Sequence, residues 1–202
     1  FLDDLRDELE TIKTIASDKT REQKLKNYQD KLASLKFLDP ACGSGNLLTE
    51  TFISLRRLEN EVLKMLNGMQ IVMGLVDPIK VSIEQFFGIE INDFAVTVSK
   101  TALWIAESQM LQQTEEIVNS NIDFLPLHSY AHIVEGNALQ LDWESVIPKA
   151  ELNYIMGNPP FLGGMMMSKE QKTEMRDVIG DVSGVGEMDY VAAWYYKASE
   201  YI

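Results

Sequence analysis

The sequence is poor in cysteine and histidine, and each shortage excludes a class of protein. Its single cysteine, Cys42, cannot form a disulfide within the chain, which excludes a disulfide-stapled fold and favours the reducing cytoplasm. The two histidines are His128 and His132, and no third His or Cys ligand stands nearby. We therefore expect a cytoplasmic protein without a metal site.

Positive charge and long apolar runs are also scarce. Acidic residues outnumber basic ones by 31 to 18, giving a formal net charge of −13. Extended contact with nucleic-acid phosphates needs Lys and Arg, so any basic surface for nucleic acid is expected in parts of the protein outside this sequence. No apolar run reaches the roughly 18 residues of a membrane span, and no signal peptide is recognisable, so we expect no membrane partner.

The 202 residues, 46% of them hydrophobic, suffice for one globular domain and an appendage. Apolar residues at helical spacing predict helices over residues 1–34, broken near residues 17–20, with Thr20 as the second N-cap. We assign residues 1–34 as an N-terminal helical segment that packs against a domain over residues 35–202. The chain begins at Phe1 and ends at Ile202 inside an apparent helix, so we expect a fragment of a longer protein.

The elements after residue 34 predict an α/β fold. An apolar strand near residues 36–38 enters the Gly43-Ser44-Gly45 loop, and an amphipathic helix over residues 47–66 follows. This is the first unit of a nucleotide-binding fold, although a Gly-x-Gly turn alone can be purely structural.

Three more strands are predicted, at residues 85–91, 131–135 and 152–156, with a helix from Asn92 or Asp93 to about Gln112. Residues 67–83, which include Gly74, are predicted as a loop or excursion. The order βαβαβ(α)β implies a mostly parallel sheet with helices on both faces. For the helix over residues 92–112 we expect one apolar face, made of Ala95, Val98, Ala102, Ile105 and Ala106.

Polar residues follow these strands at the edge where open α/β sheets bind ligands. Glu90 ends the second strand, where a carboxylate can accept both hydroxyls of a ribose, and Asn137 follows the third. The fourth strand ends in Gly157-Asn158-Pro159-Pro160-Phe161. Two carbonyl acceptors, at Asn158 and Pro159, beside the face of Phe161 suit a planar ring that bears an exocyclic amine. A structural Pro-Pro turn with Phe161 in the core is the alternative.

The segment over residues 162–187 contains five glycines and is predicted to hold a helix over residues 169–179. Glycines beside a site indicate either a mobile lid or a poorly ordered connection. A final helix with one apolar face is predicted over residues 189–198, and the strand that should follow it is missing.

Four stretches together resemble the S-adenosylmethionine-dependent N6-adenine DNA methyltransferases of large prokaryotic restriction-modification enzymes. They are residues 39–46, 88–91, 136–139 and 158–161. The resemblance implies a Rossmann-like class I methyltransferase fold, truncated at the C-terminus, over residues 35–202. It also implies S-adenosylmethionine as the cofactor and DNA as the partner.

The resemblance assigns roles to two groups of residues. The cofactor-binding group comprises Asp39, Pro40, Ala41, Cys42, Gly43, Gly45, Glu90, Ile91, Asn137 and Ala138. Within it, Asp39 and the following loop would hold the methionine end, Glu90 the ribose and Ile91 the adenine ring. Asn137 stands where the family often has Asp. The final helix, from Asp189, resembles the motif that lines the cofactor and target pockets in this family. The catalytic group comprises Asn158, Pro159, Pro160 and Phe161, with Phe161 stacking on a flipped base.

Two other readings stay open. Methyltransferases of protein glutamine amides or of RNA amines also use Asn-Pro-Pro followed by an aromatic residue, often Tyr. The other reading is a cofactor-binding module without catalytic activity, and the intact Asn158-Pro159-Pro160-Phe161 motif argues against it. For the isolated 202 residues we expect weak DNA binding and poor methylation, since no basic face is evident.

Overall fold

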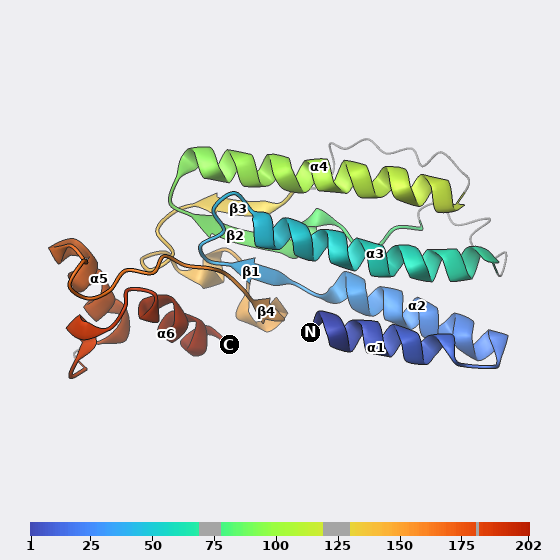
Figure 1. The fold of residues 1–202 in the computed structure, drawn as a ribbon, viewed down its shortest axis with the longest axis horizontal. Helices are drawn as coiled ribbons and strands as arrows, with labels where there is room; N and C mark the ends of the chain where they lie inside the picture. The colour runs from blue at the N-terminus through green and yellow to red at the C-terminus, as the bar shows by residue number, and fades with distance from the viewer. Residues whose placement is uncertain (69–77, 119–129, 181) are drawn as a thin grey trace. The chain divides into compact units, whose positions relative to one another are not determined.

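The computed structural model describes residues 1–68, 78–118, 130–180 and 182–202 (Figure 1). By its internal contacts the chain divides into two compact units. Unit 1 comprises Phe1–Leu35, Thr49–Gln85 and Thr101–Ala131, and unit 2 comprises Lys36–Leu48, Phe86–Lys100 and His132–Ile202. Two sequence predictions lie outside the described residues, namely most of the excursion around Gly74 and the residue His128.

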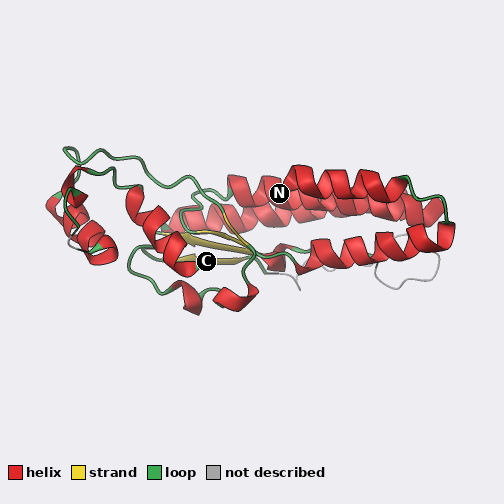
Figure 2. Cartoon of the chain, turned by 90° about the horizontal axis from the view of Figure 1, so that it is seen from below, coloured by secondary structure: helices red, strands yellow, loops and turns green. Residues whose placement is uncertain are grey.

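Unit 1 is built from helices (Figure 2). It contains α1 (Leu2–Lys13), α2 (Asp18–Ser34), most of α3 (Asn46–Gly68) and of α4 (Asp93–Val118), and the short turn η1 (Ile83–Gln85). The apolar positions spaced three and four apart are the buried ones, as an amphipathic helix requires. On α1 and α2 they include Leu5, Leu9, Leu25 and Leu32, and the Tyr28 hydroxyl donates to the Leu5 carbonyl at 2.9 Å.

A buried polar cluster lies inside unit 1. Arg56 and Glu59 form an ion pair, and Arg56 also donates to the Thr114 hydroxyl at 2.6 Å. The second carboxylate oxygen of Glu59 accepts from the Gln29 amide and from the Lys80 backbone N–H, both at 2.7 Å. The Glu59 charge is therefore fully paired, and it ties the backbone at residue 80 to α3.

Two details of the helix predictions were wrong. The second helix starts at Asp18 and not after Thr20, because Ser17 has the extended backbone of an N-cap and the Asp18 carboxylate suits the positive helix end. The helix that Asn92 caps, by accepting from Ala95 N–H at 3.0 Å, runs to Val118 and not to residue 112.

The face expected for α4 was right for Ala106, which is buried, and wrong for Ile105. Ile105 is 47% exposed, whereas Val96, Ser99 and Leu103 are buried. The expectation followed apolar residues alone, but the buried face includes the small polar Ser99, which makes room for a glycine loop described below.

Unit 2 carries a four-stranded parallel sheet in the order β3-β2-β1-β4 (Figure 1). The strands are β1 (Phe37–Asp39), β2 (Phe86–Glu90), β3 (His132–Glu135) and β4 (Tyr154–Ile155). The strands β2, β3 and β4 lie within predicted strands, and β1 overlaps its predicted strand but extends to Asp39. The predicted fold class, a Rossmann-like α/β fold, is confirmed. Because the strands are parallel, all four carboxyl ends meet at one edge.

One face of the sheet in unit 2 is covered by the C-terminal part of the chain. Leu38, Phe87 and Ile89 of the sheet share a core with Met175 of α5 (Lys169–Ile179) and Trp194 of α6 (Ala192–Tyr201). Trp143 of the short turn η2 (Trp143–Ser145) and Val185 of η4 (Val185–Glu187) join this core, and a third turn, η3 (Lys149–Glu151), precedes β4.

The predicted bounds of α5 are confirmed, and a capping box between Ser168 and Gln171 fixes its start. The last helix, α6, begins three residues later than predicted. The Asp189 carboxylate accepts from the Leu162 and Val191 N–H groups, at 2.9 and 3.0 Å, and so holds a turn before the helix.

Among the described residues, no helix is both long and apolar enough to cross a membrane. No cluster of three His, Cys, Asp or Glu side chains suited to a metal ion was found in the same residues.

Candidate active site at the carboxyl ends of the strands

The loop after β1 is held by hydrogen bonds that its backbone N–H groups donate. Asp39 is 1% exposed, and its carboxylate accepts from the Ala41 N–H at 2.9 Å. The Cys42 N–H donates to the Ile89 carbonyl of β2 at 3.1 Å, so the loop is joined to the neighbouring strand.

Two glycines in this loop have positive φ and serve different purposes. A Cβ atom at Gly45, where φ is +79°, would lie 2.8 Å from Cβ of Ser99, so only glycine allows the loop to approach α4. At Gly43, where φ is +54°, a Cβ atom would meet nothing within 4 Å. Gly45 therefore serves packing, and Gly43 borders open space.

Burial dominates the titration of the two acidic groups in the loop. It raises the pKa of Asp39 to about 6, partly offset by the Ala41 hydrogen bond and reinforced by the charge of Glu90. Burial, with the nearby charges of Asp39 and Glu90, raises the pKa of the Cys42 thiol to about 12. The thiol is therefore protonated at neutral pH and is no nucleophile.

Glu90, at the end of β2, closes this part of the site. One carboxylate oxygen accepts from the Gly43 N–H and the other from the Asn92 N–H, both at 2.9 Å. These bonds fix the carboxylate, and each oxygen keeps lone-pair capacity for further donors. Ile91, which follows it, is 68% exposed.

The loop after β4 lies directly beside that after β1. The Met156 N–H donates to the Leu38 carbonyl at 2.9 Å, and a Cβ atom at Gly157 would lie 2.8 Å from the Asp39 carboxylate. Only glycine permits this approach, which brings Asn158 next to the β1 loop. Pro159 is buried, whereas Asn158 and Pro160 are exposed and Phe161 is 69% exposed. The alternative that placed Phe161 in the core was therefore wrong.

Asn137, after β3, is held on both sides of its amide. Its carbonyl oxygen accepts from the Leu139 N–H at 2.9 Å, and its NH₂ group donates to the Glu174 carboxylate of α5. The side chain thus has a defined orientation.

These loops surround one cavity of about 440 Å³. Of the residues expected in the site, eight line it: Pro40, Ala41, Glu90, Ile91, Asn137, Ala138, Asn158 and Pro160. Six others stand outside the lining: Asp39, Cys42, Gly43, Gly45, Pro159 and Phe161. Of these, Asp39 supports the loop from below, and Gly43 is bonded to Glu90.

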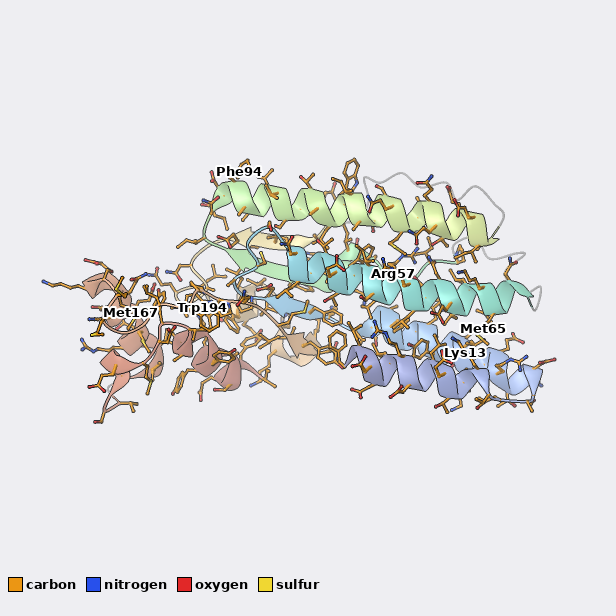
Figure 3. The ribbon with its side chains drawn as sticks, viewed as in Figure 1. Lys13, Arg57, Met65, Phe94, Met167 and Trp194 are labelled. Atoms are coloured by element: carbon orange, nitrogen blue, oxygen red, sulfur yellow. The ribbon has the colours of Figure 1, made fainter. Side chains whose placement is uncertain are left out.

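Five further residues line the cavity: Ile89, Gly136, Gln171, Tyr190 and Trp194. Tyr190 and Trp194 belong to the stretch from Asp189 for which the resemblance implied a pocket lining, whereas Gln171 was not singled out from the sequence. Trp194 (labelled in Figure 3) donates its indole N–H to the Pro40 carbonyl at 3.2 Å and makes an edge-on ring contact with Tyr190. The Ser168-x-x-Gln171 capping pattern was the available signal for Gln171.

Comparison with known proteins agrees with this architecture. Residues 15–202 match the protein family described as MmeI, DNA-methyltransferase domain. DNA methyltransferase A of Bacillus subtilis (strain 168) is 42% identical over 183 residues, which cover 88% of this chain and 20% of that protein. A putative type II restriction enzyme and methyltransferase of Methanocaldococcus jannaschii is 25% identical over 104 residues, 50% of this chain and 9% of that protein.

A solved structure is similar over the whole chain. It is the Type IIL restriction-modification enzyme MmeI in complex with DNA, with a TM-score of 0.91 and 39% sequence identity. The match covers 100% of this chain and 26% of that protein, so the chain spans about a quarter of the length of this relative. The chain belongs to the family of the MmeI DNA-methyltransferase domain, within the DNA methyltransferases of restriction-modification enzymes.

Proposed function

We propose that the protein transfers a methyl group from S-adenosylmethionine to the N6 amine of adenine in DNA, as the modification part of a larger restriction-modification protein. The observation that carries this proposal is the cavity that Glu90, Asn137 and Asn158 line together, although they come from three separate strand ends. Residues 35–202 would carry the chemistry, with residues 1–34 as a helical segment.

The residues on the β1 side fit the cofactor. The fixed Glu90 carboxylate has lone pairs left for two ribose hydroxyls, and the exposed Ile91 offers an apolar surface to a purine. Asp39, the backbone from Pro40 to Gly45, and Ala138 complete the group that would hold it. When bound, S-adenosylmethionine supplies an electrophilic methyl group on a sulfonium sulfur.

The residues on the β4 side fit an amine on a planar ring. The side-chain carbonyl of Asn158 and the backbone carbonyl of Pro159 are acceptors for the two N–H groups of such an amine. Accepting both hydrogens favours a pyramidal nitrogen with a localised lone pair, which makes the amine a better nucleophile. Pro160 shapes the loop, and the exposed face of Phe161 can stack on a base that has left the duplex.

DNA as the partner is supported by the relatives, since the MmeI structure was solved in complex with DNA. The net charge of −13 indicates that most phosphate contacts come from other parts of the full-length protein. The isolated 202 residues are therefore expected to bind DNA weakly, with an affinity that falls further as salt is raised.

The test uses the full-length protein and S-adenosylmethionine with a labelled methyl group. Duplex DNA is incubated with both, digested to nucleosides and separated, and the label is expected in N6-methyldeoxyadenosine. Label in cytosine derivatives would contradict the adenine assignment. Label in protein or RNA, with none in DNA, would establish the glutamine or RNA-amine reading instead.

A further inference from the structure

Three hydrogen-bond donors converge on one carboxylate behind the cavity. Glu174, on α5, accepts from the Asn137 side-chain amide, from the Gln140 side-chain amide at 2.8 Å and from the Tyr190 hydroxyl. Two of these donors, Asn137 and Tyr190, line the cavity proposed for the cofactor, whereas Glu174 does not. It lines a separate cavity of about 390 Å³ with Gln140 and Asp177.

We propose that Glu174 is a positioning residue for the cofactor site, which orients the Asn137 amide so that its carbonyl oxygen serves as an acceptor for the ligand. This inference rests on the proposed function and names a residue that acts on the ligand only through Asn137 and Tyr190.

The chemistry of the three donors fixes the orientation. An ionised carboxylate accepts hydrogen bonds and donates none, so the Asn137 side chain must turn its NH₂ group toward Glu174. Its oxygen then faces the Leu139 N–H, with which it bonds at 2.9 Å. That oxygen has a second lone pair, which is left for a donor in the cavity such as an exocyclic amine.

Tyr190 is held in the same way. Burial, together with the hydrogen bond to Glu174, raises the pKa of the Tyr190 phenol, so it stays protonated and donates. Its ring contacts Trp194 edge-on at 5.0 Å between centroids, and Trp194 donates to the Pro40 carbonyl. Glu174 thus joins lining residues from two sides of the cavity.

The loop that carries Asn137 has its own support. The ammonium group of Lys197 donates to the backbone carbonyls of Ala138, Leu139 and Leu141 at 2.8, 3.0 and 2.6 Å. A change at Glu174 is therefore expected to alter the orientation of side chains and not the course of this loop.

The experiment measures binding of S-adenosylmethionine, and of its unreactive analogue sinefungin, to the full-length protein by titration calorimetry. In Glu174→Gln one of the two accepting oxygens becomes an NH₂ group, so the side chain cannot accept from both Asn137 and Tyr190, and these two lining residues are no longer held in one orientation. We expect the dissociation constant to rise about tenfold, the usual size for a lost charged hydrogen bond. Asp177→Asn, on the same helix but exposed, is the matched control and should bind like the unmodified protein.

A second substitution tests whether Glu174 orients the Asn137 side chain or only packs against it. Asn137→Asp alone places two carboxylates face to face, so binding should weaken about tenfold at pH 8 and recover as the pH falls and one carboxyl is protonated. In Asn137→Asp with Glu174→Gln, the new Gln NH₂ donates to the new carboxylate, and we expect affinity within about threefold of the unmodified protein. Thermal denaturation of each variant checks folding.

The inference is overturned if Glu174→Gln binds like Asp177→Asn, or if the double variant is weaker than both single variants. Absence of binding by the unmodified protein would instead overturn the proposed function itself, so the two failures can be told apart.

Discussion

The two sides of the cavity are built in opposite ways. On the β1 side, residues 39–45 and Glu90, the polar groups are held by protein hydrogen bonds, and Asp39 is almost wholly buried. On the β4 side, residues 158–161, Asn158, Pro160 and Phe161 are exposed. The polar groups of the β1 side are therefore already fixed within the protein. The side chains of Asn158, Pro160 and Phe161 on the β4 side are instead open to solvent.

This difference matches what each side is proposed to bind. A cofactor is the same molecule in every cycle, so a rigid, preorganised pocket binds it at little entropic cost. A base arrives from DNA and must leave again, which suits an open site. Substitutions on the β1 side should therefore alter stability and cofactor affinity, while those on the β4 side should alter the rate and leave both unchanged.

The largest effect is expected at Asn158. Asn158→Ala removes one acceptor for the target amine and should lower kcat by about 10²–10³, the cost of losing one preorganised polar group at a reacting centre. Cofactor affinity and melting temperature should stay unchanged because the side chain is exposed. Single-turnover methyl transfer, with calorimetry for the cofactor, measures both.

Asn153→Ala is the matched control for Asn158. Asn153 stands before the same strand but accepts from the Lys36 N–H at 2.7 Å, away from the cavity lining. It should cost about 1 kcal/mol of stability and leave kcat unchanged. Equal loss of kcat in both variants would show that the strand's integrity, and not the Asn158 side chain, limits the rate.

Next in size is a pH effect at Asp39. Burial raises the pKa of this carboxyl from its ordinary value near 4 to about 6, so the folded protein binds the proton more tightly than the unfolded chain does. Ionisation therefore costs stability, which is lost as the pH rises from about 4 to about 6. The shift corresponds to about 3 kcal/mol.

Asp39→Asn removes this ionisation but keeps an acceptor for the Ala41 N–H. The variant should be more stable than the unmodified protein above pH 6, by up to about 3 kcal/mol, and the gain should vanish near pH 4. Urea denaturation from pH 4 to pH 8 gives the difference. A gain that does not change with pH would mean that the Asp39 carboxyl does not titrate in this range.

The two glycines of the β1 loop give a smaller contrast. Gly45→Ala puts a methyl group 2.8 Å from Ser99 Cβ at a positive φ, and should cost about 2–3 kcal/mol of stability. Gly43→Ala meets no atom within 4 Å, so only the backbone term of about 1 kcal/mol is expected. The methyl group of Gly43→Ala would enter the open space next to Glu90, so this variant should lose cofactor affinity more than stability. A larger loss of stability in Gly43→Ala than in Gly45→Ala, measured by denaturation, would refute the assignment of Gly45 to packing and Gly43 to the open space of the site.

The strands and the site loops could be predicted because each is encoded locally. Apolar runs followed by Gly, Asn or Glu mark strand ends, and parallel strands bring those ends together, so Glu90, Asn137 and Asn158 were predictable as one site. The start of α5 is also encoded locally, by the Ser168–Gln171 capping box.

The parts that failed depend on contacts distant in sequence. The buried face of α4 includes Ser99 because Gly45, 54 positions earlier, packs against it. Nothing near Glu174 indicates that it meets Asn137, 37 residues away. The start of α6 depends on Asp189 bonding back to Leu162. Such pairings appear only once the sheet places the loops.

The smallest effect, and the sharpest check of the open side, is at Phe161. Phe161→Leu keeps an apolar side chain but removes the flat ring, so stacking on an extruded base is lost. We expect kcat/KM for DNA to fall about tenfold, within the usual value of one base–aromatic contact, while stability changes by less than about 0.5 kcal/mol. Phe161→Tyr retains the ring and should stay near the original rate.

With 2-aminopurine at the target position, the fluorescence rise that reports base extrusion should weaken in the Leu variant alone. A large loss of stability in Phe161→Leu would mean that this ring supports the fold, and the contrast between a closed β1 side and an open β4 side would not hold.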